Sequence, residues 1–179
     1  MGRELRRREQ KNAAVEQAWR IHDAQVAWTV AVDAKASFSF ALQSAIIAAV
    51  GALVAADRVF RDLHDWRNWF LLAGGVGLVT GVGFAAAVVA PRLRPHHLRK
   101  ESATNYIYFG HLRHWKDRAS ELAARLPSDD MLPQLTRQIV IMGDIAWRKH
   151  RCVQISIWAG VAGGALLLAY AVLSTLPAK

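Results

Sequence analysis

The stretch SFSFALQSAIIAAVGALVAA, residues 37–56, contains no Asp, Glu, Lys or Arg. Two further stretches share this property: WFLLAGGVGLVTGVGFAAAVVA, residues 69–90, and ISIWAGVAGGALLLAYAVLSTL, residues 155–176. A helix needs about 20 predominantly apolar residues to cross the hydrocarbon layer of a bilayer. Buried helices of a soluble protein are usually shorter and amphipathic. The three stretches therefore predict three transmembrane helices.

The basic residues are divided unevenly among the segments that flank these stretches. Of the 23 Lys and Arg residues, seven lie in residues 1–36, three in 57–68, twelve in 91–154 and one at Lys179. Basic residues resist translocation, so the two segments richest in them are expected in the cytoplasm, and the short loop and the C-terminus outside. Much of the net charge of +9 then faces anionic lipid, and we expect no nucleic-acid partner.

The polar segments beside the spans also predict helices. Residues 4–59 contain no proline and one interior glycine, so the N-terminal arm is expected to continue as a single helix into the first span. Pro91 and Pro95 are expected to end the second span. Ser128 is a candidate N-cap, followed by the first-turn acids Asp129 and Asp130, for a helix that runs into the third span.

An apolar stripe predicts one more helix, from about residue 97 to residue 127. Its members recur at spacings of three and four residues: Tyr108, Leu112, Trp115, Ala119, Leu122 and Leu126. Such spacing is typical of one face of a helix. The predicted fold is an all-α membrane protein, three transmembrane helices with a cytoplasmic helical bundle. Its parts are a cytoplasmic helix (1–36), transmembrane helices (37–56, 69–90 and 155–176) and a cytoplasmic helical region (91–154).

The segment YIYFGHLRHW, residues 106–115, contains the residues most suggestive of a site. Gly110 costs about 1 kcal/mol in a helix interior relative to alanine, which suggests close approach by a neighbouring helix or by a ligand. His111 and His114 share a helical face, but no Cys or carboxylate nearby in the sequence completes a ligand set, so we expect no metal. No phosphate loop, nucleophile elbow or paired catalytic carboxylate is recognisable, and we expect no catalytic residues and no enzyme.

Two glycine pairs lie within the spans. Gly77 with Gly81, and Gly160 with Gly164, have the small-xxx-small spacing that lets helix backbones approach closely. The spacing is compatible with contact within one subunit and with contact between subunits.

Three segments, WTVAVDAKASFSFAL (residues 28–42), YFGHL (residues 108–112) and RQIVIMGDIAWRKHRCV (residues 137–153), resemble the transmembrane effectors of the bacterial Pycsar anti-phage system. WTVAVDAKASFSFAL (residues 28–42) is similar to the family's acidic-x-Lys-Ala-Ser element at its first span, which maps onto Asp33, Lys35, Ala36 and Ser37. YFGHL resembles its Phe-Gly-His element, at Phe109, Gly110 and His111. RQIVIMGDIAWRKHRCV (residues 137–153) resembles its closing helix, at Gln138, Ile145, Ala146, Lys149 and Arg151. The resemblance covers roughly residues 20 to 170.

The resemblance implies a two-gene defence system. A neighbouring cyclase, a partner only through its signal, makes cyclic CMP or cyclic UMP, and the effector then impairs the inner membrane and kills the infected cell. It implies a protein that needs no cofactor beyond this signal ligand and that assembles with copies of itself in the lipid membrane. A constitutive scaffold that binds a protein partner through residues 3–28 is the alternative.

A cyclic nucleotide needs a cation for its phosphate and an aromatic or amide group for its base. The candidate binding residues are Tyr108, His111, Arg113, Gln138, Lys149 and Arg151. Lys149 and Arg151 are also suited to anchor the third span at lipid headgroups. The polar pair at the membrane boundary, Asp33 and Lys35, is suited to pair with them and so to fix helix register.

Overall fold

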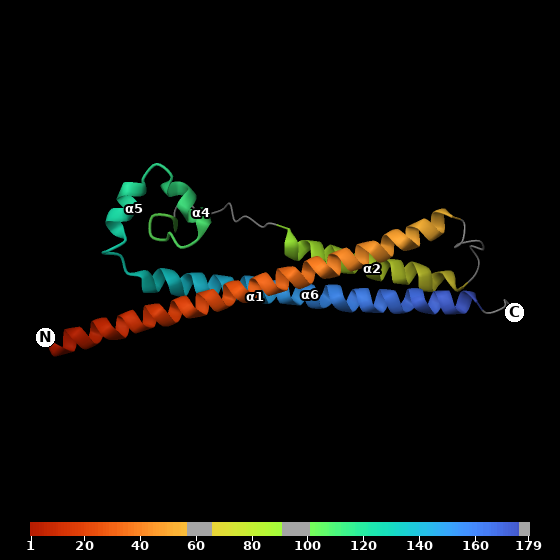
Figure 1. Cartoon of the computed structure of the whole chain (residues 1–179), viewed down its shortest axis with the longest axis horizontal. Helices are drawn as coiled ribbons and strands as arrows, with labels where there is room; N and C mark the ends of the chain where they lie inside the picture. The colour runs from red at the N-terminus through yellow and green to blue at the C-terminus, as the bar shows by residue number, and fades with distance from the viewer. Residues whose placement is uncertain (57–65, 91–100, 176–179) are drawn as a thin grey trace. The chain divides into compact units, whose positions relative to one another are not determined.

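The computed structural model contains helices and no strands over the residues it describes, which are 1–56, 66–90 and 101–175 (Figure 1). The helices are α1 (Gly2–Ala55), α2 (Asn68–Val89), α4 (Phe109–Leu112), the 3-10 helix η1 (Arg113–Trp115), α5 (Ala119–Arg125) and α6 (Met131–Ser174). Three of them, α1, α2 and α6, are long and apolar enough to cross a membrane. The predicted fold class, an all-α protein with three such helices, is confirmed.

The two long helices extend well beyond the apolar stretches. α1 is 54 residues long and α6 is 44 residues long, and neither is interrupted. Both continuous helices were expected, because residues 4–55 contain no proline and the only proline of α6, Pro133, lies in its first turn, where proline is tolerated. α2 ends at Val89, and Ala90 is extended with ψ 128°, the conformation favoured before a proline. Pro91, Pro95 and most of the 57–68 loop lie outside the described residues.

The predicted helix over residues 97–127 is wrong across its described part. Tyr108 is extended (φ −81°, ψ 132°) and Arg118 also leaves helical geometry (φ −130°, ψ 32°), so the stripe is divided among α4, η1 and α5. Trp115 Nε1 donates a hydrogen bond to the carbonyl of Ser102 at 2.9 Å. Thirteen residues of continuous helix would separate these two groups by about 20 Å. The chain therefore folds back between Ser102 and Trp115, and the indole ring is buried.

The expected N-cap of the last helix is also corrected. Asp130 Oδ1 accepts a hydrogen bond from the backbone N–H of Leu132 at 3.1 Å, which is the capping contact at the start of α6. Ser128 instead donates to the carbonyl of Arg125 at 3.1 Å and belongs to the preceding turn.

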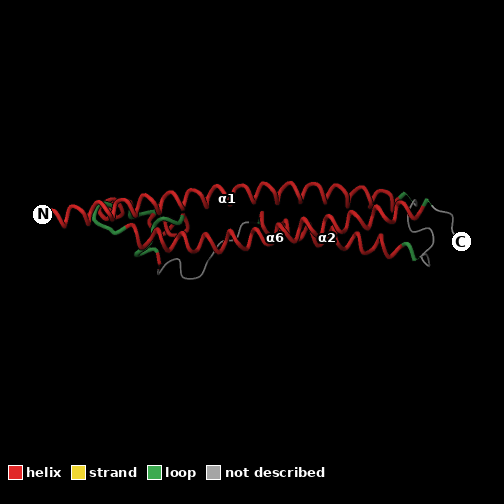
Figure 2. Tube along the Cα trace, turned by 90° about the horizontal axis from the view of Figure 1, so that it is seen from below, coloured by secondary structure: helices red, strands yellow, loops and turns green. Residues whose placement is uncertain are grey.

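The chain divides into two compact units. The first comprises residues 1–29 and 91–147, and the second comprises residues 30–90 and 148–179. In the first unit the buried apolar residues include Ala18 of α1, Tyr106, Trp115 of η1 and Leu135 of α6. In the second unit the apolar parts of α1, α2 and α6 run alongside one another (Figure 2).

α2 packs in the second unit through a regular stripe. Its buried residues recur at three- and four-residue spacings: Asn68, Leu71, Gly74, Leu78, Gly81, Ala85 and Val88. That spacing is typical of knobs-into-holes packing between helices. Val88 joins Val32 and Ala36 of α1 and Val153 of α6 in one apolar cluster, so all three helices of the unit contribute to its core.

Candidate functional site

In the segment from Asn105 to Trp115, the ring of Tyr108 packs directly against Gly110. Tyr108 precedes α4, and its carbonyl accepts hydrogen bonds from the backbone N–H groups of His111 at 2.9 Å and Leu112 at 3.3 Å. A Cβ at Gly110 would overlap the ring of Tyr108. The close approach expected at Gly110 is therefore made by its own neighbour in sequence, and neither a second helix nor a ligand is needed to explain this glycine.

His111 is the most enclosed of the candidate binding residues, with 3% of its surface exposed. Its Nε2 lies 3.3 Å from Oε2 of Glu101, and its ring packs edge-on against Tyr108 with centroids 5.5 Å apart. No carboxylate close to His111 in the sequence was expected to complete a ligand set. In the structure the chain folds back and places Glu101, ten residues earlier, beside the imidazole ring. Within the described residues no group of three or more His, Cys, Asp or Glu is arranged to hold a metal ion.

Three buried polar atoms of the first unit have no hydrogen-bond partner. Among the described residues the four such atoms are Gln25 Oε1, Asn105 Nδ2 and His111 Nδ1 in the first unit and Gln43 Oε1 in the second. Buried polar groups in proteins are nearly always hydrogen-bonded, so each such atom marks a capacity to bind something. The three supply an acceptor, a donor and an imidazole nitrogen that takes either role according to its tautomer. Gln25 and Asn105 were not among the predicted site residues, since a lone amide gives no signal in sequence.

Two amides of α6 line the same unit. Gln134 and Gln138 are buried and one helical turn apart. Gln134 Oε1 accepts a hydrogen bond from the backbone N–H of Tyr106 at 3.3 Å, and Gln25 Nε2 of α1 donates to the carbonyl of Ile139 at 3.1 Å. The predicted site residue Gln138 therefore lies close to two contacts of α6. Gln134 binds the 101–115 segment, and the carbonyl of Ile139 binds the arm of α1.

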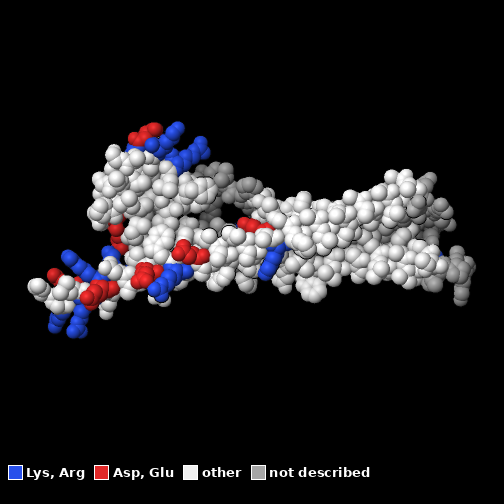
Figure 3. Space-filling view, in the orientation of Figure 1, with Lys and Arg blue, Asp and Glu red and all other residues white. Residues whose placement is uncertain are grey.

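The predicted cationic residues are divided between the two units. Arg113 is exposed in the first unit, whereas Lys149 and Arg151 belong to the second unit. There Lys149 Nζ donates to both carboxylate oxygens of Asp33, at 2.6 and 2.8 Å, and Arg151 is exposed. Lys149 is thus engaged by the acidic residue that was expected to fix helix register. Charged side chains on the face of the second unit seen in Figure 3 gather mostly at one end.

A second charged cluster holds the short helices together. The guanidinium groups of Arg118 and Arg125 lie 4.7 and 5.2 Å from the centroid of the Trp115 ring. Both bind Glu121, and the hydrogen bond from Arg118 lowers the pKa of that carboxyl. Arg125 also donates to the carbonyl of Ala103 at 3.0 Å. These two arginines are engaged by Glu121 and Trp115, whereas Arg113 and Lys116 are exposed.

The first unit also contains a groove of about 580 Å³ between the arm of α1 and the start of α6. Its lining includes one cation, Lys11, and three carboxylates, those of Glu16, Asp129 and Asp130. Lys11 Nζ lies 2.9 Å from Asp130 Oδ2, and the resulting hydrogen bond lowers the pKa of Asp130. The net negative lining repels a phosphate, so this groove does not suit a nucleotide.

The glycines of the spans pack within the chain. A Cβ at Gly77 would lie 3.0 Å from the Cα of Gly163, and a Cβ at Gly74 would lie 2.9 Å from the carbonyl oxygen of Gly163. A Cβ at Gly164, by contrast, would meet nothing within 4 Å, so of this pair only Gly160 makes a close contact within the chain. Gly74 and Gly163 were missed because their contact joins two helices whose relative register the sequence does not reveal.

Gly81 and Gly160 both make room for the side chain of Gln43, and Gly81 also lies against the backbone carbonyl of Ser156. A Cβ at Gly81 would overlap Gln43 Oε1, and one at Gly160 would lie 2.8 Å from Gln43 Nε2. Gln43 Nε2 donates to Ser39 Oγ at 2.7 Å and to the carbonyl of Ser156 at 3.2 Å. An amide of α1 thus reaches between α2 and α6 and links all three helices inside the apolar region.

Comparison with known proteins supplies the family. The family model of the Pycsar effector protein domain matches residues 17–176, nearly the whole chain. The chain belongs to this family. The resemblance found in the three sequence segments is thereby confirmed. No curated protein and no solved structure matches the chain. This Pycsar effector is a membrane protein by family and by its three apolar helices.

Proposed function

We propose that this chain is the effector of a bacterial anti-phage defence system, activated by cyclic CMP or cyclic UMP, and that it impairs the inner membrane to cause abortive infection. The single observation that carries the proposal is the match to the Pycsar effector domain over residues 17–176. The presence of three helices suited to cross a membrane supports the membrane as the target. In this proposal the effector acts by changing conformation or assembly, without catalysis.

The nucleotide is proposed to bind in the first unit. The unpartnered atoms of Gln25, Asn105 and His111 supply the acceptor and donor groups that the edge of a pyrimidine base requires. The Tyr108 ring, in contact with His111, offers a stacking surface, and stacking on aromatic side chains is a common way to hold a base. Arg113 is the proposed phosphate ligand, because a guanidinium binds phosphate through charge-assisted hydrogen bonds.

The membrane part is proposed to sit in the bacterial inner membrane with the N-terminus in the cytoplasm. Twelve Lys and Arg in residues 91–154 and seven in residues 1–36 support this orientation. Both halves of the first unit are then cytoplasmic, where a cyclase would release its product. Further copies of the chain are the proposed partners for membrane damage, and the cyclase acts through its nucleotide alone.

The test is to express the full-length chain in bacteria with an active pyrimidine cyclase and with a catalytically dead cyclase, and to follow membrane potential with a voltage-sensitive dye. We expect the potential to collapse with the active cyclase only. An unchanged potential at saturating nucleotide, or an equal fall with the dead cyclase, contradicts signal gating. Either result would favour a constitutive scaffold that binds a partner through residues 3–28.

A further inference from the structure

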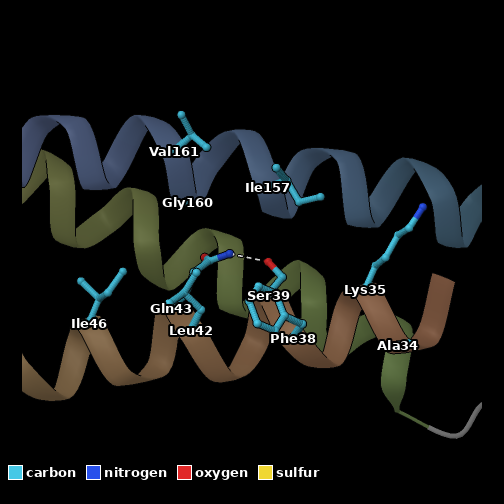
Figure 4. A pocket seen from close by; sticks show the side chains of 10 residues that line it. All are labelled: Ala34, Lys35, Phe38, Ser39, Leu42, Gln43, Ile46, Ile157, Gly160 and Val161. Carbon is cyan, nitrogen blue, oxygen red and sulfur yellow. Dashed lines mark hydrogen bonds between the residues drawn. The ribbon is translucent and has the colours of Figure 1, made fainter. Parts of the chain in front are cut away.

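A groove of about 690 Å³ runs between α1 and α6 in the second unit (Figure 4). Phe38, Leu42 and Ile46 line it from α1, and Ile157 and Val161 line it from α6. Ser39 and Gln43 lie between these walls, and Figure 4 shows the hydrogen bond that joins them. The walls of the groove are therefore apolar, and Ser39 and Gln43 are already bound to each other.

One end of the groove has a positive charge. Lys35 is the only charged residue among those that line it, and it begins the α1 stripe that continues through Phe38, Leu42 and Ile46 at spacings of three and four residues. Beyond Lys35, α1 has no further charged residue up to Ala55, and α6 has none from Cys152 to Ser174. Lys35 therefore marks the level at which these helices pass from polar surroundings into the apolar layer.

The length of the stripe matches one leaflet of a bilayer. Eleven residues separate Lys35 from Ile46, which corresponds to about 16 Å along a helix. Half of the hydrocarbon core is roughly 15 Å thick. A chain that lies in the groove with its head at Lys35 would thus extend to about the middle of the membrane.

We propose that this groove binds one acyl chain of an anionic phospholipid, with the lipid phosphate at Lys35. The neighbouring carboxylate of Asp33 does not offset the charge of Lys35, because Lys149 Nζ binds both of its oxygens. Lys35 therefore contributes a net positive charge at headgroup level, which is complementary to an anionic headgroup.

A lipid chain suits this groove better than a helix from a second copy. Close packing of membrane helices uses small residues, which let the backbones approach. Gly74, Gly77 and Gly163 are already used for contact between α2 and α6, and Gly160 is covered by the amide of Gln43. The groove instead presents exposed aromatic and branched side chains at Phe38, Ile157 and Val161, between which a flexible chain fits and a rigid helix does not.

The experiment measures lipid retained by the purified full-length protein. The protein is reconstituted in bilayers that mix phosphatidylglycerol with phosphatidylcholine, and bound lipid is identified by native mass spectrometry. We expect the wild type to retain phosphatidylglycerol preferentially. Lys35→Gln should lower that preference about fivefold, the effect of one basic residue at a membrane surface, and Lys35→Arg should keep it. Leu42→Trp, which fills the groove, should lose both lipids.

Two matched variants control for general effects. Arg137→Gln removes a charge from an exposed position of α6 outside the groove lining, and Val76→Trp introduces a tryptophan at an exposed position of α2. We expect both to retain phosphatidylglycerol as the wild type does. The proposal is wrong if the wild type shows no preference, if Arg137→Gln weakens it as much as Lys35→Gln, or if Leu42→Trp retains lipid in full. It is also wrong if Leu42→Trp only converts a dimer to a monomer, since the occupant would then be a second copy.

Discussion

Lys149 Nζ of α6 lies 2.6 Å from Oδ1 of Asp33 of α1, and 116 positions of sequence separate the two residues. Both side chains are partly exposed, at 24% and 39%, so water screens their attraction and the pair contributes about 1 kcal/mol or less. The pair joins two long helices, and the ammonium group is bound to both carboxylate oxygens.

Lys149→Ala and Asp33→Ala are therefore expected to lower thermal stability in detergent by a similar amount, roughly 2–4 °C. The double variant should cost less than the sum of the two single variants, since both remove one interaction. Thermal unfolding of the purified proteins measures this. Strict additivity of the two changes would mean that the pair does not stabilise the protein.

Gly81→Leu should destabilise the three-helix packing by about 1–3 kcal/mol, the usual penalty for overfilling a packed site. A side chain at residue 81 would overlap the Gln43 amide, which would have to leave its partners Ser39 and Ser156. Gly77→Leu should act similarly by forcing α2 away from Gly163.

Gly83→Leu is the matched control for these variants, because a Cβ at residue 83 meets nothing within 4 Å. Thermal stability in detergent and toxicity in cells are compared for the three variants. If Gly81→Leu and Gly77→Leu behave as Gly83→Leu does in both assays, the close contacts of α2 contribute neither to stability nor to function.

Gly110→Ala should also destabilise the protein, by about 1–3 kcal/mol, because the added methyl group would overlap the Tyr108 ring. The same substitution in a Tyr108→Ala background should cost much less, since the obstructing ring is gone. Chemical denaturation of the four proteins gives the coupling. An equal cost in both backgrounds would show that Gly110 is required for another reason, such as backbone conformation.

The long helices could be predicted from sequence because their determinants are local. Apolar runs without charge, together with an absence of proline from the interiors of α1 and α6, suffice to specify them. The 101–126 segment could not be predicted this way. Its stripe has helical spacing, yet Trp115 reaches Ser102 and Tyr106 reaches Gln134, contacts that exist only after the chain has folded back.

The candidate site could also be predicted only in part, because some of its residues are recognisable only from contacts made after folding. Aromatic and basic residues such as Tyr108 and Arg113 stand out in a sequence, whereas the buried amides of Gln25 and Asn105 acquire meaning only from their unpartnered atoms. Lys149 was expected either to bind the phosphate or to anchor the third span and pair with Asp33, and in the structure it pairs with Asp33. Its partner Asp33 lies on another helix, and sequence spacing does not reveal which basic residue that carboxylate selects.

The topology prediction follows from the basic residues. A reporter fused after Lys179 should be active outside the cytoplasm, and one inserted near Pro127 should be active inside, because residues 91–154 contain twelve Lys and Arg. Paired alkaline phosphatase and fluorescent protein fusions measure the two positions. The opposite pattern would invert the orientation and would place the proposed nucleotide site outside the cell.

The affinity for nucleotide should depend on Arg113 more than on the other cationic residues. We expect purified protein to bind cyclic CMP or cyclic UMP, and Arg113→Ala to weaken that affinity by about 1.5–3 kcal/mol, the contribution of a hydrogen bond to a charged group. Arg137→Ala removes the same charge from an exposed position of α6 in the same unit and should leave affinity unchanged. His111→Ala and Asn105→Ala should weaken binding as well, because each supplies an unpartnered buried atom.

Isothermal titration calorimetry in detergent measures these affinities, and thermal unfolding of each variant separates lost binding from lost folding. Lys149→Ala should change affinity less than Arg113→Ala, since Asp33 already binds the Lys149 ammonium. A larger loss for Lys149→Ala would move the phosphate to the second unit. If Arg113→Ala and Arg137→Ala bind the nucleotide equally well while both remain folded, Arg113 does not contact the phosphate. Removal of a direct phosphate ligand must lower the binding affinity, because a charge-assisted hydrogen bond is lost.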